Sequence, residues 1–347
     1  MNIIKVNNLL REFKIAKSDG SFLAHLFRRK FETIKAVDNV NFAIKKGELV
    51  GFIGPNGAGK STTIKMLSGI LVPTSGEIRV FDSIPHKNRK ENAKKIGVVF
   101  GQRSQLWWDL PVYDTFLLLK KIYNVSDETF SRNIEVFESR LDIKSFYKQP
   151  VRQLSLGQRM RADIAASLLH DPELIFLDEP TIGLDVVVKN QIREFIKEIN
   201  YKRNVTVILT THDMRDIEEI CNRIIMIDKG SVVLDMPVTD VSGNLGGTIR
   251  VVMDFEEIPN KVDIPSKVKI IERVGPRWIF SFSSTDLTVG QFISSVLSKH
   301  RIIDVSVKKA EIEDVIRDIY TGKIRLDYGG NKPDEQGLKQ YESTRIS

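Results

Sequence analysis

The sequence predicts an α/β fold in which helices cover a parallel sheet, with an antiparallel β flank, a helical lobe and a small C-terminal α+β module. The first observation behind this prediction is a set of short runs that are apolar nearly throughout, as strands buried on both faces must be. These runs are ELVGFI (48–53), IGVVF (96–100), LIFLD (174–178), VTVILT (205–210) and RIIMID (223–228). The second observation is that helical stretches alternate with these runs, which is typical of a parallel sheet. We therefore expect one α/β domain over residues 1–240.

Two other runs, IKAVDNVNFAI (34–44) and GEIRVF (76–81), alternate apolar and polar residues. Such alternation indicates strands with one solvated face, so these runs predict the antiparallel flank. Between Val112 and Gln149 the sequence is helical and charged and has no strand pattern. We interpret this segment as a separate helical lobe that extends over about residues 112–170.

The character of the sequence changes after residue 240. The strand-like runs TIRVVMDF, VKIIERV and RWIFSF are followed by a helical stretch from Thr288 to Lys299, the strand-like run IIDVSVKK and the amphipathic stretch EIEDVIRDIY. This order predicts a second domain over residues 241–322, with strands, two helices and a modest core of its own. Residues 323–347 are charged and polar without apolar periodicity, so we expect a disordered tail.

Composition sets broad limits on function. The chain has 52 Lys and Arg against 45 Asp and Glu, a net charge of +7, which is compatible with an anionic ligand, a lipid surface or nucleic acid. Its longest purely apolar runs, such as Phe116–Leu119 and Leu174–Leu177, fall far short of the ~20 residues that span a bilayer. The N-terminus lacks the pattern of a secretory signal, so we expect a cytoplasmic protein.

A glycine-rich segment between a buried strand and a predicted helix indicates a phosphate-binding loop. Glycine-rich backbone can point successive N–H groups at a phosphate, and a helix start adds partial positive charge. In this spacing Lys60 neutralises the β and γ phosphates of a nucleotide, and the Ser61 hydroxyl coordinates Mg²⁺. The predicted loop is formed by Gly54, Pro55, Asn56, Gly57, Ala58, Gly59, Lys60, Ser61 and Thr62.

Polar residues follow three of the predicted strands, at the sheet edge where ligands bind in such folds. Asp178 ends one strand and can reach Mg²⁺, and Glu179 follows it as the candidate general base. His212 follows another strand and is the candidate donor to the γ phosphate. Gln102 has the same placement and can link water or Mg²⁺ to the next segment, with Gln105 as the competing candidate.

A second anion-binding turn lies in the segment QLSLGQ, where Ser155 and the N–H groups of Leu156 and Gly157 begin a helix that runs to about Leu169. Together with GPNGAGKST, Gln102, LIFLDEP, TIGLD and TTHD, this LSLGQ turn resembles the ATP-binding subunits of ABC transporters in order and spacing. The resemblance covers residues 1 to about 240 and implies the parallel-sheet fold of a phosphate-loop ATPase.

The resemblance also implies how the two turns are used. In that family two such domains face each other head to tail, and each ATP contacts the phosphate loop of one domain and the LSLGQ turn of the other. By this resemblance Ser155, Gly157 and Gln158 bind the nucleotide of a partner subunit. By the same resemblance Asp185, in TIGLD, would lie at the dimer seam, in the position of the family's loop that couples the two sites.

The family stacks an aromatic residue near the N-terminus on adenine. Phe13 matches the local context of that residue best, whereas Phe31 matches its distance to the next strand, because residues 14–33 lengthen the usual connection. We prefer Phe13. This lengthened segment is apolar and basic, and it either lies on anionic lipid or packs on the protein itself.

These features predict an ATPase subunit that works as a dimer with integral membrane permease subunits, peripheral on the inner face of the cell membrane. Trp107 and Trp108 fall where family members form a groove for a helix of the membrane subunit, with core packing as an equal contender. The C-terminal domain resembles those of type-2 export ATPases, so export is favoured over uptake. No nucleic acid partner is expected. The alternative is a soluble ABC-type ATPase of DNA repair, translation or cluster assembly.

Overall fold

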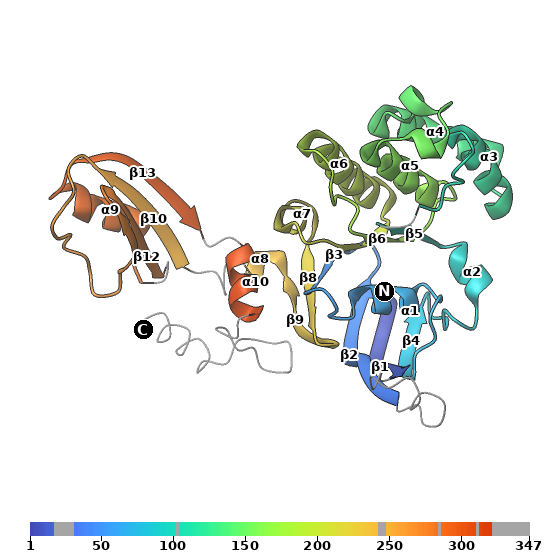
Figure 1. Cartoon of the computed structure of the whole chain (residues 1–347), viewed down its shortest axis with the longest axis horizontal. Coiled ribbons are helices and arrows are strands. Elements are labelled where there is room, and N and C mark those ends of the chain that lie inside the picture. The colour runs from blue at the N-terminus through green and yellow to red at the C-terminus, as the bar shows by residue number, and fades with distance from the viewer. Residues whose placement is uncertain (17–30, 102–103, 242–247, 284–285, 310–311, 321–347) are drawn as a thin grey trace, which may run out of the picture. The chain divides into compact units, whose positions relative to one another are not determined.

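The computed structural model describes residues 1–16, 31–101, 104–241, 248–283, 286–309 and 312–320. The chain divides into two compact units, Met1–Asp235 and Met236–Ser347 (Figure 1). The predicted end of the first domain, at residue 240, lies close to this division. The predicted tail, residues 323–347, lies outside the described residues.

The first unit is built on a six-stranded sheet with strand order β5-β6-β7-β3-β8-β9. Every residue of β3 is buried, and so is every residue of β7, as expected for strands covered on both faces. Strands β5, β6, β7, β3 and β8 pair in parallel. Their bounds are β3 Leu49–Ile53, β5 Ile96–Phe100, β6 Leu174–Asp178, β7 Thr206–Thr210 and β8 Arg223–Asp228, with β9 at Ser231–Pro237.

An antiparallel sheet with strand order β2-β1-β4 flanks the parallel one. The sequence patterns predicted β2 (Phe31–Lys45) and β4 (Ser75–Val80) but missed the central strand β1 (Asn2–Ala16). Register shifts interrupt the pairing of β1 with β2 at four places. Because each shift resets which side chains face the core, β1 lacks the regular alternation that identifies a strand.

Helix α1 (Lys60–Leu67) follows β3 directly and packs with both sheets. Its buried apolar side chains belong to one core cluster that also includes residues of the parallel sheet and of the antiparallel flank. The members from α1 are Ile64, Met66 and Leu67, and members from the sheets include Ile4, Val6, Ile44, Phe52, Phe176 and Ile225. This packing fixes the start of α1, and with it the loop between β3 and α1.

The predicted helical lobe is present as helices α3 (Val112–Tyr123), α4 (Asp127–Leu141) and α5 (Leu156–Leu168). Figure 1 shows these three helices, in green, grouped on one side of the parallel strands. Helix α6 (Val186–Arg203) packs on α4 and on α7 (Met214–Ile220). Among the described residues of this unit, the other helical elements are α2 at Arg89–Ala93 and the short 3₁₀ turns at Ile143–Phe146 and Val151–Gln153.

The second unit contains an antiparallel sheet with strand order β11-β12-β10-β13. Phe292 and Val296 of helix α9 pack into a core formed with the sheet, whose members include Val251, Met253, Trp278 and Phe280. In the part of this unit that the structure describes, the elements are α8 Val238–Asp240, β10 Thr248–Phe255, β11 Lys269–Val274, β12 Arg277–Ser283, α9 Val289–Leu297, β13 Ile302–Lys309 and α10 Ile312–Tyr320. Over the described ranges, none of the helices is both long and apolar enough to cross a membrane.

A buried carboxylate ties α5 to the segment that follows β5. Asp163 is 6% exposed, and its Oδ1 accepts hydrogen bonds from the Ser104 hydroxyl (2.9 Å) and the Gln105 backbone N–H (3.0 Å). Burial raises the pKa of Asp163 to about 6, against the lowering effect of the two hydrogen bonds and of the Arg159 charge. The neutral acid is therefore favoured in the folded protein relative to the unfolded chain.

This shift predicts a pH-dependent effect of Asp163→Asn on stability. Because the folded pKa (about 6) exceeds the ordinary 3.8, the contribution of Asp163 is fully present below pH 3.8 and is lost as pH rises through 6. The loss amounts to about 3 kcal/mol for the parental protein, and the neutral variant does not undergo it. Urea unfolding should therefore show the stability of Asp163→Asn, relative to the parent, rising by about 2 kcal/mol between pH 4 and pH 7, because pH 4 already lies slightly above 3.8.

The exposed Asp114 on α3 provides the control, since Asp114→Asn should show no such change over the same pH range. A constant difference between Asp163→Asn and the parent at all pH values would contradict the buried-acid assignment.

Candidate functional site

The predicted phosphate loop lies between the end of β3 and the start of α1. Gly57 (φ 82°) and Gly59 (φ 105°) have left-handed backbone conformations that favour glycine. A Cβ on Gly59 would lie 2.3 Å from the Ala36 carbonyl oxygen, so this glycine permits close packing onto β2. A Cβ on Gly57 would meet nothing within 4 Å. The loop is thus packed against the protein at Gly59 and open at Gly57, where a ligand can approach its backbone.

The Lys60 side chain lies beneath this loop. It is 7% exposed, and its Nζ donates to the carbonyl oxygens of Gly54 (2.5 Å) and Pro55 (3.1 Å). Burial lowers the pKa of the Lys60 ammonium, while the charges of Glu179 and Asp178 act in the opposite direction. The ammonium and the two carboxylates therefore belong to one electrostatic site.

The side chains of Ser61, on α1, and Asp178, at the end of β6, lie within hydrogen-bonding distance of each other. The Ser61 hydroxyl lies 3.2 Å from Asp178 Oδ2, and the Thr210 hydroxyl donates to Asp178 Oδ1 at 2.6 Å. Hydroxyl and carboxylate oxygens are ligands that Mg²⁺ accepts, and Mg²⁺ in nucleotide sites takes only one or two carboxylates beside the phosphates. The residues present therefore fit Mg²⁺ bound together with a nucleotide.

Glu179 follows Asp178 and has a strained backbone, with a φ of 55°. Its backbone N–H donates to two oxygens of Thr210, the carbonyl oxygen at 3.0 Å and the hydroxyl oxygen at 3.1 Å. The Glu179 carboxylate lies 2.5 Å from Nε2 of His212, which comes just beyond β7. Both side chains line a pocket of about 260 Å³. The structure thus brings together two residues that were predicted separately from two strand ends.

Gln102 lies outside the described residues. The competing candidate, Gln105, is turned toward α5, where its Nε2 donates to the Asp163 carbonyl oxygen at 2.9 Å.

The two aromatic candidates differ in exposure. Phe13, in β1, is half-buried and carries the Arg11 guanidinium 4.6 Å from its ring centre. Phe31, at the start of β2, is 59% exposed. The apolar and basic part of the lengthened connection, residues 17–30, lies outside the described residues.

Trp107 and Trp108 are not core residues. They are 41% and 53% exposed, so the core-packing interpretation of the sequence was wrong. Four apolar residues of α3 are exposed as well: Tyr113, Leu117, Leu118 and Ile122.

The LSLGQ turn is a preformed helix start. Ser155 is the N-cap of α5, and its hydroxyl accepts from the Gln158 N–H at 3.2 Å, while the Gln158 side chain accepts from the Ser155 N–H at 2.9 Å. This capping box fixes the backbone of the turn. Leu156 is 39% exposed, so the turn lies at the protein surface.

Asp185 caps the next helix, α6, by accepting from the Val188 N–H at 2.9 Å. Beside it Val186 and Val187 are 67% and 77% exposed. Two helix starts, those of α5 and α6, therefore reach the surface with apolar side chains next to them.

Sequence reasoning missed several polar residues around this site. Thr210 lies opposite Asp178 in the register of β6 with β7, and a threonine at that strand end was the available signal. Asp216, on α7, accepts from Thr181 and Thr211, which flank Glu179 and His212 in sequence. No local pattern pointed to Asp216, because its partner Thr181 lies 35 residues away in the sequence.

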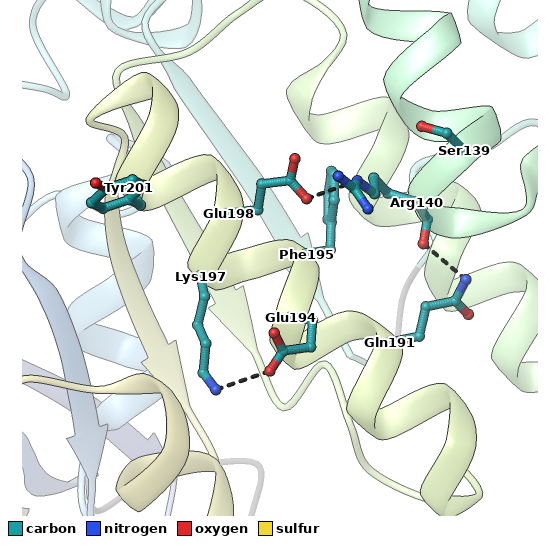
Figure 2. Close-up of a pocket in the computed structure, with 8 residues that line it drawn as sticks. All are labelled: Ser139, Arg140, Gln191, Glu194, Phe195, Lys197, Glu198 and Tyr201. Carbon is teal, nitrogen blue, oxygen red and sulfur yellow. Dashed lines mark hydrogen bonds and ion pairs between the residues drawn. The ribbon is translucent and has the colours of Figure 1, made fainter.

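A hollow of about 530 Å³ lies between α4 and α6 (Figure 2). Its charged side chains pair with one another, as in Arg140 with Glu198 (2.8 Å) and Lys197 with Glu194 (3.0 Å). None of the predicted site residues lines it. The candidate site is therefore the sheet edge and not this hollow.

Comparison with known proteins identifies the family. Residues 37–182 match the family model described as ABC transporter. The chain is 34% identical over 209 residues to the ABC transporter ATP-binding protein NatA of Bacillus subtilis, covering 60% of this chain and 84% of NatA. It is 38% identical over 212 residues to the linearmycin resistance ATP-binding protein LnrL of the same species, covering 61% of this chain and 67% of LnrL. The methionine import ATP-binding protein MetN 2 of Oceanobacillus iheyensis matches at 28% identity over 94% of this chain and 95% of its own length.

The solved structures agree with this result. The ATP-binding cassette MJ0796, determined as a dimer in a post-hydrolysis state with ADP and phosphate, matches with a TM-score of 0.57 and 29% identity. That match covers 68% of this chain and 98% of the cassette. The fold, the motifs and these relatives together show that the chain belongs to the ATP-binding proteins of ABC transporters and is an ATPase subunit of such a transporter.

Proposed function

We propose that the chain hydrolyses Mg²⁺-bound ATP between two head-to-tail subunits and thereby drives transport through separate integral membrane permease subunits. The observation that carries this proposal is the meeting of three strand ends: β3 leads into the phosphate loop, β6 into Asp178 and Glu179, and β7 into His212. A nucleotide whose phosphates lie on the loop faces both the carboxylates and the imidazole.

In the proposed site the loop N–H groups and Lys60 hold the phosphates. The Lys60 ammonium exchanges its bonds to the Gly54 and Pro55 carbonyl oxygens for phosphate oxygens. Ser61, Asp178 and Gln102 would hold Mg²⁺, which when bound neutralises charge on the β and γ phosphates. Phe13 would stack on adenine with one face of its phenyl ring, while the Arg11 guanidinium lies over the other face.

The proposed chemical step places Glu179 as general base. As a water oxygen bonds to the γ phosphorus, its proton passes to the Glu179 carboxylate, and the bond from phosphorus to the β-γ bridging oxygen breaks. His212, 2.5 Å from that carboxylate, orients it and donates a hydrogen bond to the γ phosphate. The strained φ of Glu179 supports this role, because such strain concentrates at functional sites.

The second anion-binding turn completes the site of the partner. Ser155, Gly157 and Gln158 would contact the γ phosphate of the nucleotide held by the partner's loop, and Asp185 would lie at the seam. Exposed Leu156, Val186 and Val187 support a surface that is covered in the dimer. A homodimer is proposed, since one chain contains both halves of the composite site.

The proposed contact with the permease is made by the exposed apolar residues at Trp107 and Trp108 and on α3. Its exposed aromatic and apolar residues suit a helix laid on the surface of the subunit. The protein would then lie at the inner face of the cell membrane, with no nucleic acid partner. Export is proposed over uptake, in line with the resistance protein LnrL, whereas MetN 2 is named an import protein.

Glu179→Gln tests the general base. The variant should keep its affinity for ATP while turnover falls by about 10²-fold or more, because the amide cannot accept the proton. A dimer should then accumulate with ATP in size-exclusion chromatography with light scattering. Glu173→Gln, just before the other end of β6, is the matched control and should behave as the parent. Parental turnover by Glu179→Gln would refute the assignment.

Mixing two inactive variants tests the composite site. Ser155→Arg blocks the turn of one subunit, and Lys60→Ala disables the loop of the other, so a mixed dimer retains one intact site. A random equimolar mixture should recover about one quarter of parental ATPase activity, because half of the dimers are mixed and each has one site of two. Lys65→Ala, on the exposed side of α1, is the control for Lys60→Ala. Full activity of a Ser155→Arg homodimer would overturn the head-to-tail arrangement.

Co-purification tests the permease contact. Detergent extracts should yield a multi-span membrane protein with the parental subunit, and the double change Trp107→Ala with Trp108→Ala should weaken this association without lowering ATPase activity of the isolated subunit. Tyr201→Ala, at an 89% exposed aromatic residue on α6, is the control and should retain the partner. Recovery of only soluble partners or nucleic acid would contradict a transport role.

A further inference from the structure

A fully buried carboxylate joins the two segments that carry Glu179 and His212. Asp216, on α7, is 0% exposed. Its Oδ2 accepts hydrogen bonds from the hydroxyls of Thr181 and Thr211, each at 2.6 Å, and its Oδ1 accepts from Nε of Arg193 at 2.7 Å. We call Asp216, Thr181, Thr211 and Arg193 the Asp216 brace.

The partners of Asp216 come from three separate places in the chain. Thr181 follows Glu179 in the segment after β6, and Thr211 immediately precedes His212 after β7. Arg193 is a buried residue of α6, the helix that Asp185 caps. One carboxylate therefore fixes both segments against each other and against α6.

Arg193 reinforces the connection on the His212 side. Its guanidinium also lies 3.3 Å from Oδ2 of Asp213, the residue after His212. Asp213 in turn pairs with Lys189 of α6 at 2.8 Å and caps α7 through the Arg215 N–H. The backbone around His212 is thus held by charged hydrogen bonds on both sides.

Burying such a charged group is costly, and apolar side chains of similar volume often stabilise a core as well or better. Charged hydrogen bonds do, however, fix directions and distances more closely than apolar contacts. The positions of Glu179 and His212 would affect the rate of hydrolysis, because displacing a catalytic group by about 1 Å can lower a rate by about 100-fold.

We infer that Asp216 is a positioning residue for ATP hydrolysis, which holds the Glu179 carboxylate and the His212 imidazole side by side through Thr181 and Thr211. The inference rests on the proposed roles of Glu179 and His212. Asp216 touches neither nucleotide nor reacting atoms, and it acts through the backbone that its partners anchor.

Thr181→Val and Thr211→Val test the inference, because valine keeps the shape of threonine and removes only the hydroxyl. Each variant should lower kcat by about tenfold or more, with KM for ATP within about twofold of the parent. The double variant should be about as slow as either single variant, since the two segments act as one unit. Thr206→Val is the control, because Thr206 is equally buried in β7 and accepts a hydrogen bond from the Gly47 N–H at 2.9 Å.

The control should retain parental kcat, so a general effect of removing a buried hydroxyl is separated from the brace. Asp216→Asn, which keeps the shape of the side chain, should give the same loss of kcat at unchanged KM. Unchanged kcat in both threonine variants would overturn the inference. A rise in KM that accounts for the whole effect would also overturn it, because the brace would then serve nucleotide binding.

A double-mutant cycle that combines Thr211→Val with His212→Ala separates this inference from the proposed function. If the brace acts through His212 and Glu179, Thr211→Val should cause little further loss in the His212→Ala background. An undiminished loss would overturn the inference. If Glu179→Gln abolishes turnover while the threonine variants keep parental kcat, the proposed function stands and only the brace fails. If Glu179→Gln retains parental turnover while the threonine variants are slow, the proposed base fails, and with it the route assigned to the brace.

Discussion

In the parallel pairing of β6 with β7, Asp178 lies opposite Thr210, and the geometry of the site depends on that register. A slip by one residue would turn Asp178 to the other face of the sheet and away from Ser61. In the observed register the Thr210 hydroxyl donates a hydrogen bond to Asp178, and the Thr210 carbonyl oxygen accepts one from the Glu179 N–H. Glu179 is the first residue after Asp178 and His212 is the second residue after Thr210, so the same register brings the Glu179 carboxylate to the His212 imidazole.

The same sheet edge receives the phosphate loop because β3 pairs in parallel with β7. Helix α1 anchors the loop in the core between the two sheets, so the N–H groups at its start are held in place before a ligand binds. The LSLGQ turn is preorganised in a different way, by the capping box of Ser155 and Gln158. A single chain thus presents two preorganised turns to which we assign anion binding, and the proposed dimer would give each of them a nucleotide.

Much of this could be predicted from the sequence, because local patterns carry it. The five core strands are apolar nearly throughout, and the phosphate loop has glycines where the structure has positive φ or close packing, as at Gly59. Strand β1 escaped prediction, since its register shifts break the alternation. The brace could not be predicted, because Asp216 meets Thr181 and Arg193 only when α6 and α7 pack. The exposure of Trp108 likewise depends on tertiary packing that an apolar residue type does not reveal.

The claim that the nucleotide is held between two subunits is tested most directly by cross-linking. A cysteine pair, Asn56→Cys on one protomer and Leu156→Cys on its partner, can be introduced in the Glu179→Gln protein, where the native Cys221 is buried. The account predicts a disulfide between protomers that forms with saturating ATP and not without nucleotide. Absence of that disulfide, with protomers remaining single at saturating ATP, would contradict it.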